Sequence, residues 1–416
     1  MDKIFQGKNV YLVGIKGAGM AGLAQILKGI GYRVKGSDIP DTFFTDDILR
    51  REKIAFHEGF DAKKIPQEID WAVSSGAYLA QQNIEIEELK RRGVAIMSYP
   101  EALARFFNSA YGIAVTGTHG KSTTSAMIAH VLTQSGHDPF ALIGAELLNW
   151  RSNARVPKNL KLTTKNYFVI EADEYREQFL YYRPQMIVVT NIDYDHSDYF
   201  ATQKDYRHAF EKFTHNLKPN GVIIENATRR NFNLKVIGRH NQENATLAFE
   251  ACKALGIPEN EIKNALESYT GLRRRLEKIG EYKGALIFDD YAHHPAEITA
   301  SLGALKKMYN RQKLIVLFHP HTYSRTNMFL KEFAQSLLLA DEIYLLDVYA
   351  SAREQAGEVG SDDIVKEIGA LSRNAKNLKT IENAVNYFRD HLTKHDLLIT
   401  MGAGDVFRVG WQLVKT

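Results

Sequence analysis

Residues 116–124 have the types and spacing of a phosphate-binding loop: Thr-Gly-Thr-His-Gly-Lys-Ser-Thr-Thr. Glycines permit a tight turn, the Lys121 ammonium and the N–H groups of a helix start can hold phosphate oxygens, and the Ser122 hydroxyl can ligate Mg²⁺. The strict G-x-x-x-x-G-K-[ST] pattern is not met, because Val115 stands at its first glycine. An apolar strand pattern precedes the loop and a helical pattern follows it. We therefore predict an ATP-type site, with a plain strand-to-helix turn as the alternative.

A second glycine-rich loop lies nearer the N-terminus. Residues 17–22, Gly-Ala-Gly-Met-Ala-Gly, satisfy G-x-G-x-x-G between a strand pattern and a helix pattern, and Asp38 lies 21 residues after Gly17. This context is typical of a dinucleotide fold, in which the loop holds a diphosphate and the acid a ribose. The alternative is a turn used only for close packing. Two such loops indicate two phosphorylated ligands, which disfavours a simple dehydrogenase.

Polar clusters follow the two apolar strands after the Lys121 loop. One cluster comprises residues 171–175 and the other residues 191–199. Ligands of open α/β sheets bind at the carboxyl ends of the strands, and Mg²⁺ prefers oxygen donors. We expect acidic metal ligands here, with solvated loop carboxylates as the alternative. Because Mg²⁺ seldom takes histidine, chemistry alone makes His196 a less obvious ligand.

Further polar runs lie at residues 238–244, 273–275, 289–295 and 318–325. The last two follow apolar strands, and their histidines, arginine and aromatic residues suit the rim of an anionic-substrate site. Metal binding by His293 and His294 is one alternative. A solvated basic turn is the alternative for residues 273–275.

These residues must be positioned by alternating strands and helices. The apolar pattern predicts helices at 20–30 and 121–134 and strands at 9–14, 32–36, 111–116, 167–170, 186–190, 285–288, 314–318, 343–346 and 397–400. Alternation of this kind is typical of an α/β protein with mostly parallel sheets. Joints near residues 108 and 271 predict three domains, 1–108, 109–270 and 271–416.

Composition narrows the class of protein. The 416 residues are 44% hydrophobic and 25% charged, which is the ordinary globular range. The net charge of +4 is thinly spread, so no nucleic-acid partner is expected. A single cysteine excludes a disulfide framework and suits a reducing compartment. Without a membrane-spanning apolar run or a signal-peptide pattern, a cytoplasmic location is expected.

With these motifs in view, the chain resembles the Mur ligases from Val10 to Asp405. The motifs that carry the resemblance are residues 14–20, 36–38, 116–124, 171–174, 190–192, 195–196, 238–241 with Asn244, 290–295 and 320–325. The family implies a Rossmann-like N-terminal domain that binds UDP, a P-loop-type central ATPase domain and a Rossmann-like C-terminal ligase domain. UDP in place of NAD also accounts for the two phosphate loops.

The resemblance implies roles residue by residue. UDP-sugar binding falls to Gly17, Ala18, Gly19, Met20, Asp38, Ser74 and Ser75. ATP binding falls to Gly117, Thr118, His119, Gly120, Lys121, Ser122, Thr123, Asn241, Asn244, Arg274 and Asp290. The residues implied to bind the metal ion are Ser122, Glu171 and His196. The residues implied to be catalytic are Lys121, Glu171, His196 and His294. The residues implied to bind the muramoyl carboxylate and the amino acid are Tyr291, His321 and Arg325.

The activity implied is ATP-dependent joining of L-alanine to the lactyl carboxylate of UDP-N-acetylmuramate, through an acyl phosphate, in peptidoglycan precursor synthesis. Mg²⁺ is the expected ion, with Mn²⁺ as a substitute, and the protein is expected to be a monomer or a weak homodimer. Glu174-Tyr175 departs from many alanine-adding members and resembles the ligase that recycles murein tripeptide. Thr322 stands where many members carry arginine, which bears on the amino-acid pocket.

Three functions therefore compete. The first is amide ligation on UDP-N-acetylmuramate, with either L-alanine or a tripeptide as the acceptor. The second is a nicotinamide-dependent oxidoreductase, which leaves Gly120-Lys121-Ser122 unexplained. The third is a nucleotide-binding regulator without chemistry, which the intact Lys121, Ser122, Glu171 and His196 disfavour.

Overall fold

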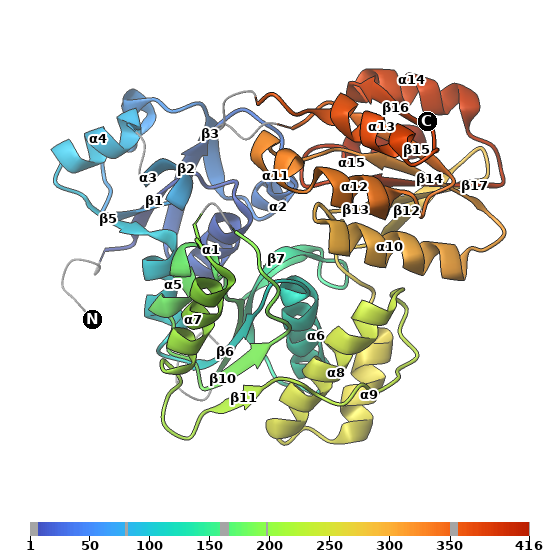
Figure 1. Ribbon diagram of the computed structural model, residues 1–416. Coiled ribbons are helices and arrows are strands. Elements are labelled where there is room, and N and C mark those ends of the chain that lie inside the picture. Colours follow the sequence, from blue (N-terminus) through green and yellow to red (C-terminus); the bar gives the residue numbers. More distant parts are fainter. Residues whose placement is uncertain (1–6, 80–81, 159–165, 197–198, 350–356, 416) are drawn as a thin grey trace. The chain divides into compact units, whose positions relative to one another are not determined.

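The computed structural model describes residues 7–79, 82–158, 166–196, 199–349 and 357–415. Three sheets flanked by helices follow one another along the chain (Figure 1). The chain divides into two compact units, residues 1–234 with 242–270, and residues 235–241 with 271–416. The first two sheets belong to the first unit and the third sheet to the second. The predicted α/β class with mostly parallel sheets is confirmed.

The first sheet is parallel throughout, with strand order β3-β2-β1-β4-β5. Its strands are β1 (Asn9–Val13), β2 (Arg33–Asp38), β3 (Ala55–Glu58), β4 (Trp71–Ser74) and β5 (Ala95–Ser98). Its helices are α1 (Ala18–Gly29), α2 (Thr45–Arg51), α3 (Gly76–Leu79), α4 (Ile84–Arg91) and α5 (Tyr99–Phe107), with a 3₁₀ turn at Ala62–Lys64. Strand order reverses beside β1, so the first glycine loop lies at a topological switch point.

The second sheet has the order β11-β10-β6-β9-β7-β8 and is parallel except for the β7–β8 pair. Its strands are β6 (Tyr111–Thr116), β7 (Phe140–Leu147), β8 (Ser152–Arg155), β9 (Tyr167–Glu171), β10 (Met186–Val189) and β11 (Val222–Ile224). The helices in this part of the chain are α6 (Lys121–Gln134), α7 (Gln203–Thr214), α8 (Arg239–Ala254) and α9 (Glu259–Ser268), and a 3₁₀ segment covers Tyr175–Tyr181.

The third sheet has the order β12-β13-β17-β14-β15-β16, with β12 antiparallel to β13. Its strands are β12 (Glu277–Tyr282), β13 (Ala285–Asp290), β14 (Lys313–Phe318), β15 (Glu342–Leu346), β16 (Ala375–Lys379) and β17 (Asp396–Met401). Its helices are α10 (Pro295–Met308), α11 (Tyr323–Met328), α12 (Leu330–Leu337), α13 (Ser361–Ala370), α14 (Ile381–His391) and α15 (Phe407–Val414). Separate apolar clusters cover its two faces.

One continuous apolar cluster joins the first two sheets. The ring of Phe107 lies 5.6 Å from that of Phe168 and 5.5 Å from that of Tyr182. Helix α1 contacts both β7 and β8, and Gln25 Nε2 donates a hydrogen bond of 2.9 Å to Asn153 Oδ1. The boundary predicted at residue 108 therefore falls inside one compact unit, and the domain limits stay predictions.

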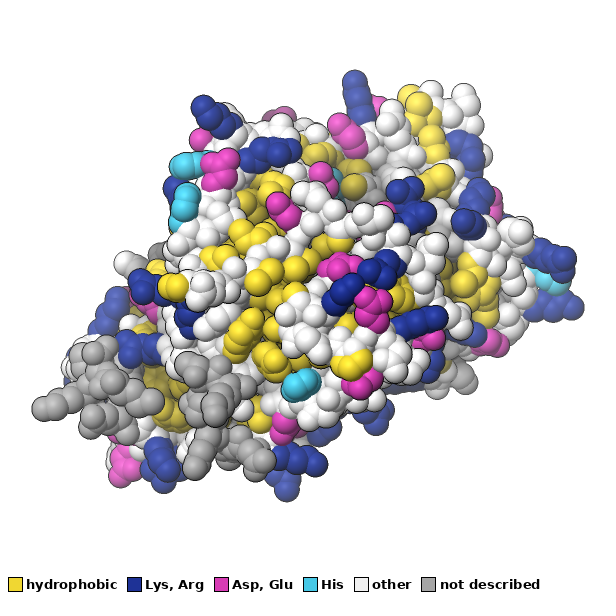
Figure 2. Space-filling view, turned by 90° about the horizontal axis from the view of Figure 1, so that it is seen from below, with side chains coloured by type: hydrophobic (Ala, Val, Ile, Leu, Met, Phe, Trp, Pro, Cys, Tyr) yellow, Lys and Arg dark blue, Asp and Glu magenta, His cyan; other side chains and the backbone are white. Residues whose placement is uncertain are grey.

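Two further observations concern the surface shown in Figure 2 and the described helices. On the face shown in Figure 2, lysines and arginines are interspersed with acidic and apolar side chains and form no continuous basic surface. Among the described helices, none combines the length and the apolar character that crossing a membrane requires.

Candidate active site

The loop between β6 and α6 needs glycine at two positions. Gly117 has φ +130° and Gly120 has φ +83°, conformations that L side chains rarely adopt. A Cβ at Gly117 would collide with the Thr190 side chain and lie 2.7 Å from the Asn191 carbonyl oxygen. A Cβ at Gly120 would collide with the Asn244 side chain. The loop thus packs tightly against the end of β10 and against α8.

Asn191 fixes this loop with both its backbone and its side chain. Its carbonyl accepts from the Thr118 N–H at 3.0 Å. Its side-chain amide accepts from the His119 N–H and donates to the His119 carbonyl, both at 2.9 Å. The predicted site did not include Asn191, although its place directly after a buried strand was a signal. Thr123 is buried in the first turn of α6, next to Ser122.

Lys121 is held in place by the loop and by a buried carboxylate. Its Nζ donates to the Gly117 carbonyl at 2.6 Å and lies 3.0 Å from Glu174 Oε2. The side chains of Lys121 and Glu174 are 13% and 1% exposed. Burial lowers the pKa of Lys121, but Glu174, Asp173 and Glu171 outweigh it and raise the pKa above its ordinary value. Lys121 is therefore a fixed positive charge at the mouth of the loop.

Ser122 and Glu171 form an oxygen-lined pair beside Lys121. Ser122 Oγ donates to Glu171 Oε2 at 2.7 Å, and the Gly144 N–H donates to the same oxygen at 2.9 Å. A hydroxyl and a carboxylate at this distance fit the donor preference of Mg²⁺. Of the three predicted metal ligands, these two lie side by side.

His196, the third predicted ligand, is grouped with Asp173 and Glu174. Ligand atoms of these three residues lie within 4.8 Å of one another, and His196 Nε2 is 3.7 Å from Glu174 Oε1. Tyr175 covers the imidazole, with ring centroids 4.6 Å apart. Asp173 and Glu174 belong to the polar run after β9 in which acidic ligands were expected, but neither was named individually as a site residue.

Asn241 and Asn244 both lie on α8 and are buried. Asn241 Nδ2 donates to the Ile237 carbonyl at 2.6 Å. Asn244 packs against Gly120 at the start of α6. Asn244 is therefore in contact with the Lys121 loop.

At the first glycine loop, Gly17 caps α1, and Ala18, Gly19 and Met20 form its first turn, which carries no acidic residue. This helix start suits an anion. Tyr99 lies against Gly19, and Ser75 lies against Gly14.

Asp38 and Ser74 are buried beside this loop. The Asp38 carboxylate accepts from the Lys16 N–H at 2.6 Å, the Ile39 N–H at 2.9 Å and the Tyr78 hydroxyl at 3.3 Å. Burial raises its pKa, and these hydrogen bonds oppose the shift. The carboxylate thus shapes the loop in this structure, and its predicted ribose contact stays a prediction.

In the second unit, Arg274 is buried and paired with Asp289. Its Nε lies 3.0 Å from Asp289 Oδ2, and its Nη2 donates to the Gly402 carbonyl at 2.6 Å. The alternative of a solvated basic turn is therefore wrong for Arg274. Asp290 is also buried, and accepts from Ser301 Oγ at 2.5 Å. Burial raises the pKa of Asp290 to about 6.

Aromatic and basic side chains gather after β13 and β14. His321 stacks on Tyr349 with ring centroids 5.8 Å apart and lies 6.4 Å from the His293 ring. His293 lies 5.3 Å from Tyr291, and Arg325 belongs to α11. Burial lowers the pKa of His293 to about 4. Tyr291 therefore follows β13, and His321 and Arg325 follow β14; β17 lies between these two strands of one sheet, and the rim stays a prediction.

His294 has a different local role. Its Nδ1 accepts from the Ala296 N–H at 3.3 Å and caps α10, while its ring lies 4.8 Å from Phe329. His293 Nδ1 instead lies 3.0 Å from the Tyr291 carbonyl. The two adjacent histidines thus have separate partners, which weighs against a shared metal ion.

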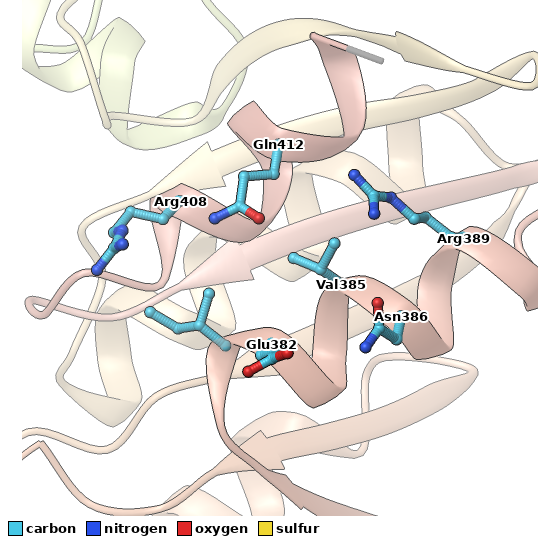
Figure 3. A pocket seen from close by; sticks show the side chains of 7 residues that line it. Glu382, Val385, Asn386, Arg389, Arg408 and Gln412 are labelled. Carbon is cyan, nitrogen blue, oxygen red and sulfur yellow. The ribbon is translucent and has the colours of Figure 1, made fainter.

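A groove between α14 and α15 is separate from these residues. Its volume is about 450 Å³, and it is lined by Ile381, Glu382, Val385, Asn386, Arg389, Arg408 and Gln412 (Figure 3). None of these is a predicted site residue.

Comparison with known proteins identifies matches along most of the chain. Residues 9–111 match "Mur ligase family, catalytic domain", residues 115–233 "Mur ligase middle domain" and residues 274–404 "Mur ligase, glutamate ligase domain". UDP-N-acetylmuramate–L-alanine ligase of Desulfitobacterium hafniense is 34% identical, with 98% of this chain and 99% of that protein covered. The same-named ligase of Carboxydothermus hydrogenoformans is 34% identical over 97% and 96%.

Solved structures share the fold. The UDP-N-acetylmuramate-alanine ligase of Thermotoga maritima has a TM-score of 0.81 at 23% identity, with 98% of each chain covered. A murein peptide ligase of Psychrobacter arcticus has a TM-score of 0.70 at 23% identity, also with 98% of each chain covered.

Proposed function

The chain belongs to the Mur ligase family, and from this premise we propose that it is an ATP-dependent ligase that joins L-alanine to UDP-N-acetylmuramate. The observation that carries the proposal is the arrangement of Lys121, Ser122, Glu171 and Glu174 at the adjacent ends of β6 and β9. A fixed cation beside an oxygen pair suits phosphoryl transfer. The proposed substrates, UDP-N-acetylmuramate and L-alanine, are those for which the relatives are named.

In the first step, the lactyl carboxylate oxygen attacks the γ-phosphorus of ATP, and the bond to the β,γ-bridging oxygen breaks. ADP leaves, and an acyl phosphate forms. Lys121 stabilises the charge that spreads over the transferring group. The N–H groups at the start of α6 hold the phosphates, with Gly117, Thr118, His119, Gly120 and Thr123 forming the rest of the cradle.

Ser122 and Glu171 are proposed to hold a divalent cation, Mg²⁺ or its substitute Mn²⁺. Their 2.7 Å separation and their oxygen donors fit such an ion. The ion, when bound, neutralises phosphate charge. Asp173, Glu174 and His196 form the neighbouring group that fits a second cation, for which His196 supplies the nitrogen donor.

In the second step, the amine of L-alanine attacks the acyl carbon. A tetrahedral intermediate forms, phosphate leaves, and the ammonium proton passes to a base. We propose that this base lies near His196 or His294. Tyr291, His321 and Arg325 are proposed to bind the carboxylates, while Asn241, Asn244, Arg274 and Asp290 are proposed to contact ATP.

The UDP-sugar is proposed to lie at the first glycine loop, with its diphosphate on Gly17, Ala18, Gly19 and Met20 and its uridine near Asp38, Ser74 and Ser75. The helix start at Gly17 and the switch point beside β1 support this. We also propose a cytoplasmic location and a monomer or weak homodimer, with domain limits 1–108, 109–270 and 271–416.

A tripeptide is the alternative acceptor. Tyr175, the residue that departs from many alanine-adding members, lies 4.6 Å from the His196 ring. A change there alters the surroundings of His196. The murein peptide ligase with a TM-score of 0.70 keeps this alternative open.

An oxygen-transfer experiment tests the chemistry. UDP-N-acetylmuramate labelled with ¹⁸O in its lactyl carboxylate is turned over with ATP, Mg²⁺ and L-alanine. We expect one labelled oxygen in the released phosphate, because the carboxylate oxygen leaves with phosphorus. Unlabelled phosphate accompanying amide formation would contradict the acyl-phosphate route.

A further inference from the structure

Lys16 lies in the first glycine loop, where a lysine would be expected to face a phosphate. Its side chain is instead fully buried. Its Nζ donates to the carbonyls of Ile39 and Asp41, at 3.0 Å and 2.8 Å, and to Glu58 Oε1 at 3.1 Å. An ammonium has three N–H donors, and these acceptors use all three. No donor is left for a diphosphate.

The segment that Lys16 holds, residues 39–46, follows Asp38 at the end of β2. Besides the Ile39 and Asp41 carbonyls, the Thr45 hydroxyl donates to the Lys16 carbonyl. The Lys16 N–H donates to Asp38, the residue directly before the segment. One residue of the glycine loop therefore ties down the start, the middle and the end of this segment.

The surroundings also balance the buried charge. Asp46 Oδ2 lies 3.5 Å from Nζ, in addition to Glu58. The ring centroids of Phe43 and Phe56 lie 5.6 Å and 5.7 Å from Lys16 Nζ. A buried ammonium is stable only when it is paired and hydrogen-bonded, so removal of its acceptors would be costly. Lys16 and residues 39–46 thus fix one another.

We propose that Lys16 is a positioning residue for the uridine end of the UDP-sugar, and that it acts through residues 39–46 without touching phosphate. This inference rests on the proposed function for the identity of the ligand. Residues 39–46 continue from Asp38 at the carboxyl edge of the first sheet, where ligands of open α/β folds bind. Their conformation sets the wall beside the glycine loop.

Lys16→Met tests the proposal, because it keeps the apolar stem and removes the ammonium. Lys28→Met is the matched control, since Lys28 lies at the other end of α1 and donates to the Glu52 carbonyl. We expect Lys16→Met to raise the KM for UDP-N-acetylmuramate about tenfold and to leave the KM for ATP within about twofold. Hydrogen exchange of residues 39–46 should accelerate about tenfold in this variant and stay unchanged in the control.

Thr45→Val is the second variant, in case Lys16→Met does not fold. It removes the Thr45 hydrogen bond to the Lys16 carbonyl without leaving a buried charge. The same two changes, smaller in size, support the proposal. Unchanged exchange in residues 39–46 would overturn it, as would equal rises in the KM for ATP and for the UDP-sugar.

Failure of the proposed function looks different. The unsubstituted protein would then show no turnover that depends on UDP-N-acetylmuramate. Exchange of residues 39–46, together with calorimetric binding of UDP itself, would still decide the role of Lys16. Loss of UDP affinity in Lys16→Met but not in Lys28→Met supports the proposal, and equal affinity overturns it.

Discussion

Lys121 and Glu174 depend on each other, because each buries a charge that the other compensates. Glu174 also accepts from the Tyr206 hydroxyl at 3.1 Å, and burial raises its pKa while Lys121 lowers it. The carboxylate therefore positions Lys121. Phosphate oxygens would compete with it for the ammonium when ATP binds.

Lys121→Met should separate catalysis from stability. We expect turnover to fall at least about a thousandfold, since the charge that stabilises phosphoryl transfer is lost. Stability should fall by about 3–5 kcal/mol, because Glu174 is left buried without its partner. The double variant Lys121→Met/Glu174→Gln should regain stability but not activity. Urea unfolding and phosphate release measure the two effects, and normal turnover in either variant would refute the role of Lys121.

Burial of His319 makes the stability of the second unit depend on pH. Burial lowers its pKa to about 4, although Asp405, 3.8 Å from Nδ1, opposes the shift. The unfolded chain binds this proton near pH 6.5 and the folded chain does not, so acidification favours unfolding. The stability that neutral His319 contributes is complete above about pH 6.5 and falls by ~3 kcal/mol towards pH 4.

Unfolding of the unsubstituted protein and of His319→Gln between pH 4 and pH 7 checks this expectation. The free energy of unfolding of the unsubstituted protein, relative to that of His319→Gln, should decrease as the pH falls. Comparison of the two proteins cancels opposing contributions such as that of Asp290, whose raised pKa favours folding at low pH. An advantage that does not vary with pH would contradict the assignment.

The loop between β6 and α6 works because its backbone adopts conformations reserved for glycine. Gly117→Ala should abolish ATP-dependent turnover, since its Cβ collides with Thr190 and with Asn191. Gly136→Ala is the control: it lies just beyond the other end of α6, at φ +78°, with nothing within 4 Å of an added Cβ. It should cost about 1 kcal/mol and leave the KM for ATP unchanged. Equal effects of the two substitutions on turnover would count against this account of the loop.

The sequence predicts the elements that carry strong local signals. Strand β6 and helix α6 have the limits that were predicted, because an apolar run, two glycines and a helical period follow one another there. The antiparallel edges β8 and β12 were not predicted. Strand β8, Ser-Asn-Ala-Arg, has no apolar alternation, and strand β12 contains a register shift at Gly280. Their pairing depends on neighbours distant in sequence.

The site residues, too, could be predicted only in part from the sequence. Sequence locates the Lys121 loop and the acidic run after β9, but not which carboxylate of that run faces inward. That choice depends on the 3₁₀ segment after Glu174, where Arg176 and Glu177 have positive φ. The burial of Asp38 likewise depends on Lys16 and Tyr78, which only the folded chain brings to it.

The parts of the chain differ in whether they have an apolar core of their own. Residues 271–416 contain their own sheet with an apolar cluster on each face. Residues 1–108 share one cluster with the second sheet, through contacts such as Phe107 with Phe168. An isolated fragment of residues 1–108 would therefore expose apolar surface that the whole chain buries.

Fragments test this difference. We expect residues 271–416 and residues 1–270 each to unfold cooperatively, and residues 1–108 alone to be unfolded or aggregated. Circular dichroism with urea titration distinguishes these outcomes. A cooperative transition in the 1–108 fragment would show that the shared cluster is not needed for its stability.

The central claim is amide ligation to UDP-N-acetylmuramate, and its most direct test is phosphate release from ATP and Mg²⁺ with that sugar present and single amino acids or the murein tripeptide added in turn. The account predicts release that requires both the sugar and L-alanine, with an amide product of the corresponding mass. Release only with the tripeptide would contradict the proposed acceptor and direct attention to Tyr175. Absence of release with every acceptor would contradict the ligase assignment itself.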